Sequence, residues 1–341
     1  MPASGRLTVA ALAEDEAAMT SGARRKQPSR GRARVGLPFT LVHLGVLAVP
    51  VVGWSWVALC GAAVLYVTRM LGITVFYHRG FAHRAFKMRR PVQLAGALLG
   101  AAAGQRGPLW WAATHRVHHR YTDRPGDPHS PVSDGFLHSH IGWLFRPLPA
   151  APGNVTDLAR FPELRLVDRY HHIAPVLTAV AAFGAGAALN RIDPALHTSG
   201  PQMLVWGFFV STTLLYHATF SVNSVAHRFG RQRFATGDAS RNNGWVALLT
   251  LGEGWHNNHH RSPASARQGL TRLELDPSWW FIRALAALHL VGGPRPVPAR
   301  VWAEAAVTDG GPGVRRRWAR QLPEPVPSAR LVLLAPSEEQ E

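Results

Sequence analysis

Long apolar segments alternate with polar, histidine-rich segments along this chain. Residues 37–52 and 54–77 are almost continuously apolar, and a second apolar pair covers residues 173–189 and 202–226. A helix needs about 20 apolar residues to cross a bilayer. The pattern therefore predicts an all-α integral membrane protein with four transmembrane helices in two hairpins. The alternative is a large soluble protein with buried helices.

The polar segments divide the chain into three parts. Residues 1–36 form a basic N-terminal tail, and residues 37–292 form the predicted membrane domain. Residues 293–341 are rich in proline, which predicts a disordered C-terminal tail. The histidine-rich segments next to the apolar pairs are expected to form a helical cap over the membrane helices.

Charge orients this arrangement. The chain has 37 Lys and Arg residues against 20 Asp and Glu, and the segment between the apolar pairs is strongly basic, whereas Arg191 is essentially the only basic residue of the outer loops. The positive-inside rule then places both termini, the cap and its site in the cytoplasm. The arginines flank apolar segments and form no aromatic-interleaved stripes, so nucleic-acid binding is not expected. With Cys60 as the single cysteine, disulfide frameworks and cysteine-ligated metal centres are excluded.

The 18 histidines are the unusual part of the composition, because many of them lie in three short clusters. The clusters are His78 with His83, His115 with His118 and His119, and His256 with His259 and His260. Positions i, i+3 and i+4 share one face of a helix, so each triplet directs three imidazoles toward one point. His227 follows Asn223 by four residues and shares its helix face. All of these residues lie near the predicted cytoplasmic ends of apolar helices, so one site can collect them.

Imidazole is a ligand for iron, copper, zinc and nickel. Eight or nine histidines are too many for one ion and indicate two. The soluble di-iron bundle pattern, which has two Glu-x-x-His motifs and two further glutamates, does not occur in the sequence, and neither does the H-E-x-x-H motif of zinc proteases. An oxygen-activating centre with two iron ions held by histidine fits best. A non-enzymatic membrane metal-binding protein is the less favoured alternative, because the histidines gather at helix ends and not at the membrane midplane.

The three clusters occur in the order and spacing H-R-x-x-x-H, H-R-x-H-H and H-N-x-H-H. Together with Leu71-Gly-Ile-Thr74 and Asp127-Pro-His129, they resemble the membrane fatty acyl desaturases of the stearoyl-CoA (Δ9) type over about residues 71–276. The resemblance implies two iron ions cycling between Fe²⁺ and Fe³⁺, a water held by Asn223, and no catalytic residue beyond the metal ligands. The implied ligands are His78, His83, His115, His118, His119, His227, His256, His259 and His260.

The resemblance implies O₂-dependent insertion of a cis double bond, with the Δ9 position favoured, into a saturated acyl chain. The carrier of that chain is acyl-CoA, acyl carrier protein or a membrane lipid. The alternative is a di-iron membrane hydroxylase of a lipid or alkane. With one cysteine and no His-Pro-Gly-Gly haem motif, the chain lacks its own electron carrier. A separate ferredoxin, rubredoxin or cytochrome with an NAD(P)H reductase is therefore expected.

Residues around the centre carry further expectations. The nearest carboxylates in sequence could hold the second nitrogen of ligand histidines, or they could be solvated loop residues. These are Asp123, Asp127, Asp238 and Glu253. Tyr66 and Met70 share a helix face and fall where the resembling enzymes close the acyl tunnel, so they are predicted to contact substrate and to limit its length. Arg69, within an apolar helix, is predicted either to be paired or functional, or to snorkel to the interface.

Overall fold

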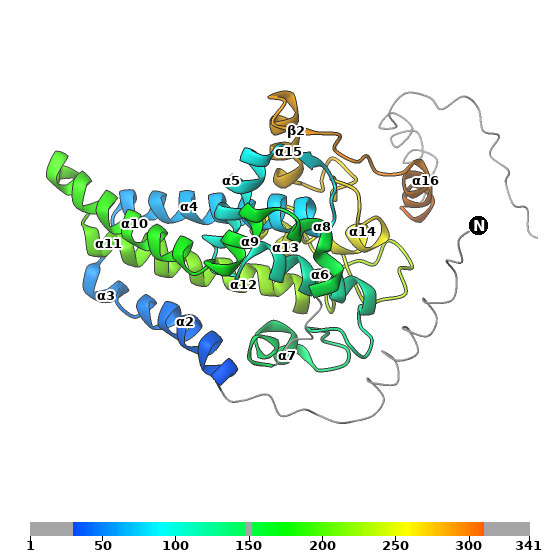
Figure 1. Ribbon diagram of the computed structural model, residues 1–341, viewed down its shortest axis with the longest axis horizontal. Coiled ribbons are helices and arrows are strands. Elements are labelled where there is room, and N and C mark those ends of the chain that lie inside the picture. Colours follow the sequence, from blue (N-terminus) through cyan, green and yellow to red (C-terminus); the bar gives the residue numbers. More distant parts are fainter. Residues whose placement is uncertain (1–29, 147–151, 310–341) are drawn as a thin grey trace, which may run out of the picture.

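The computed structural model describes residues 30–146 and 152–309, and within them regular structure is almost entirely helical (Figure 1). The exception is a short antiparallel pair of strands, β1 (Lys87–Met88) and β2 (Val291–Gly292), in which Met88 lies opposite Val291. The prediction of a helical protein is confirmed.

The long helices run side by side, and the histidine-bearing helices gather toward one end of them (Figure 1). The apolar helical stretches consist of consecutive elements: α2 (Arg30–Val46) and α3 (Val49–Val52); α4 (Trp56–Leu71) and η1 (Gly72–Ala82); α10 (Ile173–Ile192); and α11 (Gly200–Leu204), η5 (Val205–Val210) and α12 (Ser211–Ser224). The remaining helices are α5 (Arg90–Ala101), α6 (Pro108–Tyr121), α7 (Phe136–His140), η2 (Gly142–Phe145), η3 (Pro152–Val155), α8 (Thr156–Ala159), α9 (Pro162–Arg169), η4 (Pro194–Leu196), α13 (Gly244–Leu249), α14 (His256–Arg261), α15 (Pro277–Ala287) and α16 (Ala299–Thr308).

Three helices of the described residues are long and apolar enough to cross a membrane: Trp56–Ala82, Ile173–Ile192 and Gly200–Ser224. They correspond to the second, third and fourth predicted spans. The first predicted span, residues 37–52, lies in the shorter apolar stretch Gly36–Val52, which is interrupted between α2 and α3. Three candidate spans are thus present, and the fourth span and the paired hairpins stay a prediction.

Two predicted boundaries differ from the structure. Helix α2 begins at Arg30, inside the predicted N-terminal tail. The prediction of disorder from residue 293 is wrong for the residues up to 309, because α16 packs Val301, Trp302 and Ala305 into a small core with Phe234. Proline density misled the prediction, since Pro298 stands at the N-cap position, before the helix begins, where its missing N–H breaks no helical hydrogen bond. Residues 1–29 and 310–341, the remainder of both predicted tails, lie outside the described residues.

A π-helical stretch, η1, carries the first histidine cluster. In an α-helix, positions five apart diverge by about 140°. Wider π-type turns, with i→i+5 bonds, reduce that divergence to about 50°. The backbone N–H of His83 accordingly donates to the carbonyl of His78 at 3.1 Å, and the two imidazole centroids lie 4.8 Å apart. His78 and His83, five residues apart, therefore lie on one face of η1 only because the helix has wider π-type turns.

Arg69 of α4 is buried, with 1% of its surface exposed, and it points toward α12. Its guanidinium donates to the hydroxyls of Thr212 at 2.6 Å and Ser211 at 2.5 Å, and it lies 5.8 Å from the centre of the Phe208 ring. Arg69 is thus paired between two candidate spans and does not snorkel. It links α4 to α12 beneath the histidine clusters.

Candidate metal centre

The nine histidines implied by the sequence resemblance come together in two neighbouring groups, each with its ligand nitrogens within 4.8 Å of one another. The first group contains His78, His83, His115, His119 and His259. The second group contains His118, His227, His256 and His260. The sequence indicated two ions but left the division of the histidines open, and the structure supplies a division into five and four.

Within both groups, Nε2 atoms face one another at short range. The distances are 2.8 Å between His83 and His115, 3.0 Å between His119 and His259, and 3.0 Å between His227 and His256. Adjacent nitrogens on one ion with metal–nitrogen bonds of about 2.1 Å lie about 3.0–3.4 Å apart. The observed spacing therefore matches imidazoles arranged around a common ion.

Four of the nine histidines turn the other ring nitrogen, Nδ1, to a carboxylate. The pairs are His78 with Glu253 at 2.5 Å, His118 with Asp127 at 3.0 Å, His227 with Asp123 at 3.0 Å, and His260 with Asp238 at 2.9 Å. These are the four acidic residues that the sequence singled out, and none of them is a freely solvated loop residue. An Nδ1–H that donates to a carboxylate leaves Nε2 with a lone pair for a metal, and it increases the basicity of that nitrogen.

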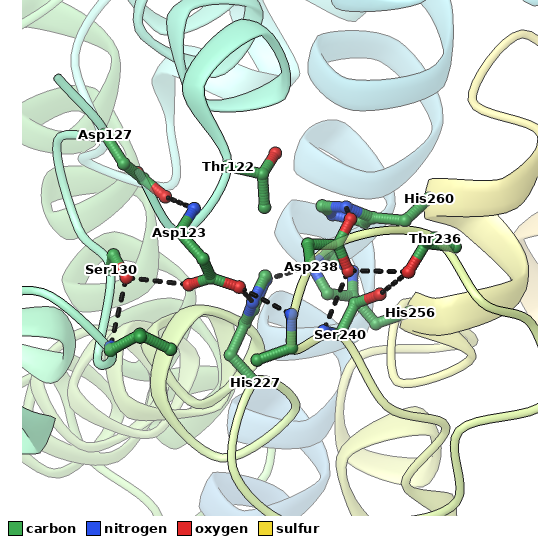
Figure 2. A network of polar contacts seen from close by, with 12 residues as sticks. Thr122, Asp123, Asp127, Ser130, His227, Thr236, Asp238, Ser240, His256 and His260 are labelled. Atoms are coloured by element: carbon green, nitrogen blue, oxygen red, sulfur yellow. Dashed lines mark hydrogen bonds and ion pairs between the residues drawn. The ribbon is translucent and has the colours of Figure 1, made fainter. Parts of the chain in front are cut away.

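Figure 2 shows how the carboxylates of the second group are themselves held. Asp123 accepts hydrogen bonds from Ser130 Oγ at 2.7 Å and from the backbone of Ala239 at 2.8 Å, in addition to His227. Asp238 accepts from Thr236 Oγ1 and from the backbone of Ser240. These additional hydrogen bonds fix the orientation of each carboxylate independently of its histidine partner.

Burial and mutual repulsion keep most of the clustered imidazoles neutral. Desolvation and neighbouring imidazoles lower the pKa well below the ordinary value for His83, His115, His119, His256, His259 and His260. Although burial alone raises the pKa of Glu253, His78 and Arg79 bring it to about 2. Neutral imidazoles beside ionised carboxylates are the protonation states that metal binding requires.

The arginines that follow the first histidine of the first and second motifs form buried or partly buried ion pairs with other segments of the chain. Arg79 is fully buried between Glu253 and Asp276, at 3.0 and 2.9 Å. Arg116 forms a bidentate pair with Asp157 at 2.7 and 3.0 Å. Sequence reasoning did not assign these arginines a role, although their place beside the first histidine of each motif was a signal. They tie the histidine helices to separate loops.

Asn257 and Asn258 of the third motif likewise bind other segments of the chain, through their side-chain amides. Asn257 Oδ1 accepts from the backbone N–H groups of Arg233 and Phe234 at 2.8 and 2.7 Å. Asn258 Nδ2 donates to Glu274 at 3.1 Å. A six-residue helix such as α14 cannot hold itself in place, because it has few internal hydrogen bonds. These amides fasten it to the surrounding loops.

His129 is a buried residue that the sequence did not single out as a ligand. Its Nδ1 lies 3.8 Å from Asp127, and its ring centroid is 4.5 Å from that of His118. Among the described residues, Nδ1 of His129 has no hydrogen-bond partner. Burial lowers its pKa to about 3. The sequence Asp127-Pro-His129 contained the signal, since Asp127 accepts from Nδ1 of His118 and from the backbone N–H of His129.

A cavity of about 880 Å³ extends from the five-histidine group, at His115, between the apolar helices. His115 and Asn223 line its inner end, together with His129. Farther along, its walls are largely aromatic and aliphatic, with Phe208, Phe209 and Tyr216 from η5 and α12. Its volume falls in the range of about 300–1,000 Å³ typical of ligand pockets. Asn223 thus meets the cavity at the histidine groups.

Tyr66 and Met70, predicted to close the acyl tunnel, do not line this cavity. The hydroxyl of Tyr66 donates to the carbonyl of Leu249 at 2.6 Å, and Met70 is fully buried in the main hydrophobic core. The reason is the rotation of α4 about its axis. Arg69 points toward α12, so the face with Tyr66 and Met70 points toward Leu249 and the main hydrophobic core. Neither residue lines this cavity, and their contact with substrate stays a prediction.

A second, smaller cavity of about 370 Å³ reaches the histidines from the polar side. It is lined by His83, His119 and His260 and by basic residues that include Arg120 and Arg124. Both arginines are exposed, and no described carboxylate pairs with either of them. The histidine groups therefore lie between an apolar cavity and a basic one.

Comparison with known proteins gives consistent matches. The family model described as fatty acid desaturase matches residues 54–292. The chain is 40% identical over 255 residues to the chloroplastic palmitoyl-monogalactosyldiacylglycerol delta-7 desaturase of Arabidopsis thaliana, an alignment that covers 73% of this chain and 65% of that protein. It is 38% identical over 255 residues to an acyl-CoA 5-desaturase of Anemone leveillei, covering 73% and 75% of the two chains. It is 37% identical over 257 residues to the sn-1 stearoyl-lipid 9-desaturase of Anabaena variabilis, covering 74% and 89%.

Proposed function

The chain belongs to the fatty acid desaturase family, a family of membrane-associated oxidoreductases, and from that premise we propose that it inserts a cis double bond into a saturated fatty acyl chain with O₂. The Δ9 position is the proposed site of insertion. The single observation that carries the proposal is that the inner end of an apolar cavity reaches His115 of the five-histidine group, beside the four-histidine group. A saturated chain in that cavity would present its methylenes to the groups.

Two iron ions are the proposed occupants of the histidine groups. The donor set supports this assignment, because nine imidazoles gather in two groups and four of them turn Nδ1 to carboxylates, which leaves Nε2 of these four available to a metal. Asn223, at the head of the cavity, is the proposed holder of a water beside the four-histidine group. When bound, the iron supplies the O₂ activation and the removal of hydrogen from an unactivated methylene.

The residues of the chain have three tasks in this reaction. The four carboxylates fix the tautomer and the direction of their histidines. The aromatic wall formed by Phe208, Phe209 and Tyr216 holds the acyl chain away from water, so that one carbon–carbon bond is positioned at the histidines. The apolar walls of the cavity also keep bulk water away from an acyl chain at His115.

Each turnover takes two electrons from outside the acyl chain. The proposed donor is a separate ferredoxin, rubredoxin or cytochrome, reduced by an NAD(P)H reductase. The smaller cavity is the proposed point of approach, because Arg120 and Arg124 surround it and His119 lies on its wall. A basic rim attracts an acidic electron carrier and raises its rate of association.

The test is lipid profiling in a desaturase-deficient host that expresses the chain, with mapping of the double-bond position. Wild-type protein should produce a cis monounsaturated chain, whereas His118→Ala, His227→Ala and His259→Ala should each lose more than nine-tenths of that product. His289→Asn is the matched control, because His289 is exposed and has a φ of +55° that asparagine tolerates.

Two results would count against the proposal. Hydroxylated product with no unsaturated chain would favour the hydroxylase alternative. Retention of more than about a tenth of wild-type product in two of the three alanine variants would contradict the nine-histidine assignment.

A further inference from the structure

Arg69 is a buried cation that the proposed reaction does not use. It is 1% exposed and lies in the candidate membrane span Trp56–Ala82. Among the described residues, no carboxylate pairs with Arg69, so an ion pair does not neutralise its charge. Burying a charge in apolar surroundings is costly, and ionisable residues within spanning helices are usually functional. A role of its own is therefore expected for Arg69.

All three nitrogens of the guanidinium donate to oxygens, and these oxygens lie on two helices. Nε donates to the carbonyl of Leu65 in α4 at 2.9 Å. The other two nitrogens donate to the hydroxyls of Thr212 at 2.6 Å and Ser211 at 2.5 Å, at the start of α12. Ser211 in turn donates to the carbonyl of Gly207 in η5 at 2.5 Å. Arg69 thus ties the end of η5 to α4.

The segment that Arg69 holds is a widened helix. The backbone N–H of Ser211 donates to the carbonyl of Trp206, five residues earlier, which is the hydrogen bond of a π-type turn. Such turns are rare within α-helices and occur frequently at functional sites. η5 lies between α11 and α12 within one candidate span, Gly200–Ser224. It therefore changes the direction of the side chains before it relative to those after it.

η5 supplies the wall of the large cavity far from the histidine groups. Phe208 and Phe209 both line the cavity, and Phe208 precedes Asn223 by 15 residues, about 20 Å along a helix. Arg69 itself does not line the cavity. Its guanidinium carbon lies 5.8 Å from the centre of the Phe208 ring, within the range of a cation–π contact. Arg69 therefore lies behind the aromatic wall at this far end.

We propose that Arg69 is a positioning residue that limits the depth of the cavity. Its hydrogen bonds to Ser211 and Thr212 hold the π-type turns of η5, and its guanidinium supports the ring of Phe208. Without these contacts the ring turns away from the cavity, which then accepts a longer acyl chain. The inference rests on the proposed function, because it explains which chain lengths that reaction accepts.

Thr212 offers the sharpest test, because its hydroxyl can be removed with little change of shape. Thr212→Val removes the oxygen that accepts from Arg69, and Thr212→Ser is the matched control that keeps it. Each full-length variant is expressed in a desaturase-deficient host that supplies sixteen- and eighteen-carbon chains. We expect Thr212→Val to shift the product ratio toward eighteen carbons by about threefold or more, because each added buried methylene contributes to affinity. Thr212→Ser should keep the wild-type ratio.

Arg69→Met tests the guanidinium itself, because it removes the charge and all donors while keeping a long side chain. Thr68→Met is its control, since Thr68 is the preceding residue of α4, is exposed and does not line the cavity. We expect Arg69→Met to shift the product ratio toward eighteen carbons by about fivefold or more, and Thr68→Met to leave it unchanged. A loss of stability alone would lower both products together and would not move their ratio.

Binding to iron-free protein separates this inference from the reaction. Purified full-length variants are incubated with radiolabelled palmitic acid and stearic acid, and the ratio of retained label is measured. We expect Arg69→Met and Thr212→Val to move that ratio toward stearic acid relative to wild type. A shifted binding ratio in a protein that forms no unsaturated product would retain the role of Arg69 and reject the proposed reaction.

Two outcomes would overturn the inference. One is an unchanged ratio of products and of retained label in both Thr212→Val and Arg69→Met. The other is an equal shift in a variant and its control, which would show that the ratio responds to any change in this part of the span. If Arg69→Met does not fold, the comparison of Thr212→Val with Thr212→Ser provides the test.

Discussion

Asp123 illustrates at the scale of one residue how this centre is held. It bonds His227, Ser130 and the backbone of Ala239, so it joins the loop after α6 to the loop after α12. Its φ is +58°, a conformation that aspartate and asparagine tolerate better than most residues. The orientation of His227 and the contact between the two loops thus depend on the carboxylate of Asp123.

Asp123→Asn is expected to weaken iron binding about 10- to 100-fold, because it removes the charge that polarises His227 while keeping the size and backbone conformation of the side chain. Iron affinity is measured by competition with a chelator. Asp134→Asn is the control, since Asp134 pairs with Arg146 at 2.7 Å and contacts none of the nine clustered histidines. Unchanged iron affinity in Asp123→Asn would show that Asp123 does not support the metal ligand.

At the scale of elements, the cavity depends on how neighbouring helices are rotated. The side chain of Phe209 in η5 lies against α2, where Gly45 leaves it room, since a Cβ there would be 2.3 Å from its ring. Phe209 precedes Asn223 by 14 residues, about 20 Å along a helix. It therefore lies on the cavity wall far from the histidine groups.

Phe209→Ala is expected to shift the ratio of sixteen-carbon to eighteen-carbon products toward eighteen carbons by about one order of magnitude. Each buried methylene is worth roughly 0.8 kcal/mol, so two added methylenes account for the shift. The ratio of products from mixed palmitoyl and stearoyl substrates measures it.

Met70→Ala is the comparison. It should leave the product ratio unchanged and lower the free energy of unfolding by about 2–5 kcal/mol, because Met70 is fully buried in the core. If only Met70→Ala shifted the product ratio, the residue that closes the acyl tunnel would lie on α4 and not on η5.

Helix α16 is a second element whose role depends on packing. Trp302→Ala should lower the free energy of unfolding by about 3–5 kcal/mol, because Trp302 is 5% exposed and packs in the core with Phe234 and Leu270. Denaturant unfolding of detergent-solubilised protein measures it. Val307→Ala on the same helix is the control, since Val307 is 65% exposed. Equal stability of the two variants would show that α16 does not contribute to the fold.

At the scale of the whole molecule, nine imidazoles from residues 78 to 260 meet in one region. Buried neutral imidazoles with facing Nε2 atoms repel one another through their lone pairs unless a proton or a cation lies between them. Ions bound in these groups would therefore join helices that are far apart in the sequence. Metal occupancy and global stability are expected to be coupled.

Removal of metal by a chelator should lower the melting temperature, since ligand at a hundredfold excess over its Kd stabilises the folded state by about 2.7 kcal/mol per site. Both iron and zinc should restore the melting temperature, but only iron should restore turnover, because zinc cannot change oxidation state. Metal analysis accompanies each measurement. Full O₂-dependent turnover by a verified zinc-only preparation would contradict the oxidative mechanism.

Local patterns in the sequence were sufficient for the helical class, three of the candidate spans, the histidine clusters and the carboxylates beside them. The reason is that residues i, i+3 and i+4 share a helix face whatever surrounds the helix. The motifs H-R-V-H-H and H-N-N-H-H therefore indicated clustered ligands, but the expectation that each triplet meets at one point is wrong, because the structure divides each triplet between the two groups. Long apolar runs likewise indicate membrane helices, because the length and apolarity needed to span a bilayer are properties of the segment alone.

Only the tertiary structure decided which partner each face meets. It divided the histidines into groups of five and four, turned Tyr66 and Met70 away from the cavity, directed Arg69 to α12, and packed α16 against Phe234. The physical reason is that periodicity defines the faces of a helix but not its rotation against neighbours distant in sequence. That rotation follows from packing and from long-range pairs such as Arg79 with Asp276, which no local pattern contains.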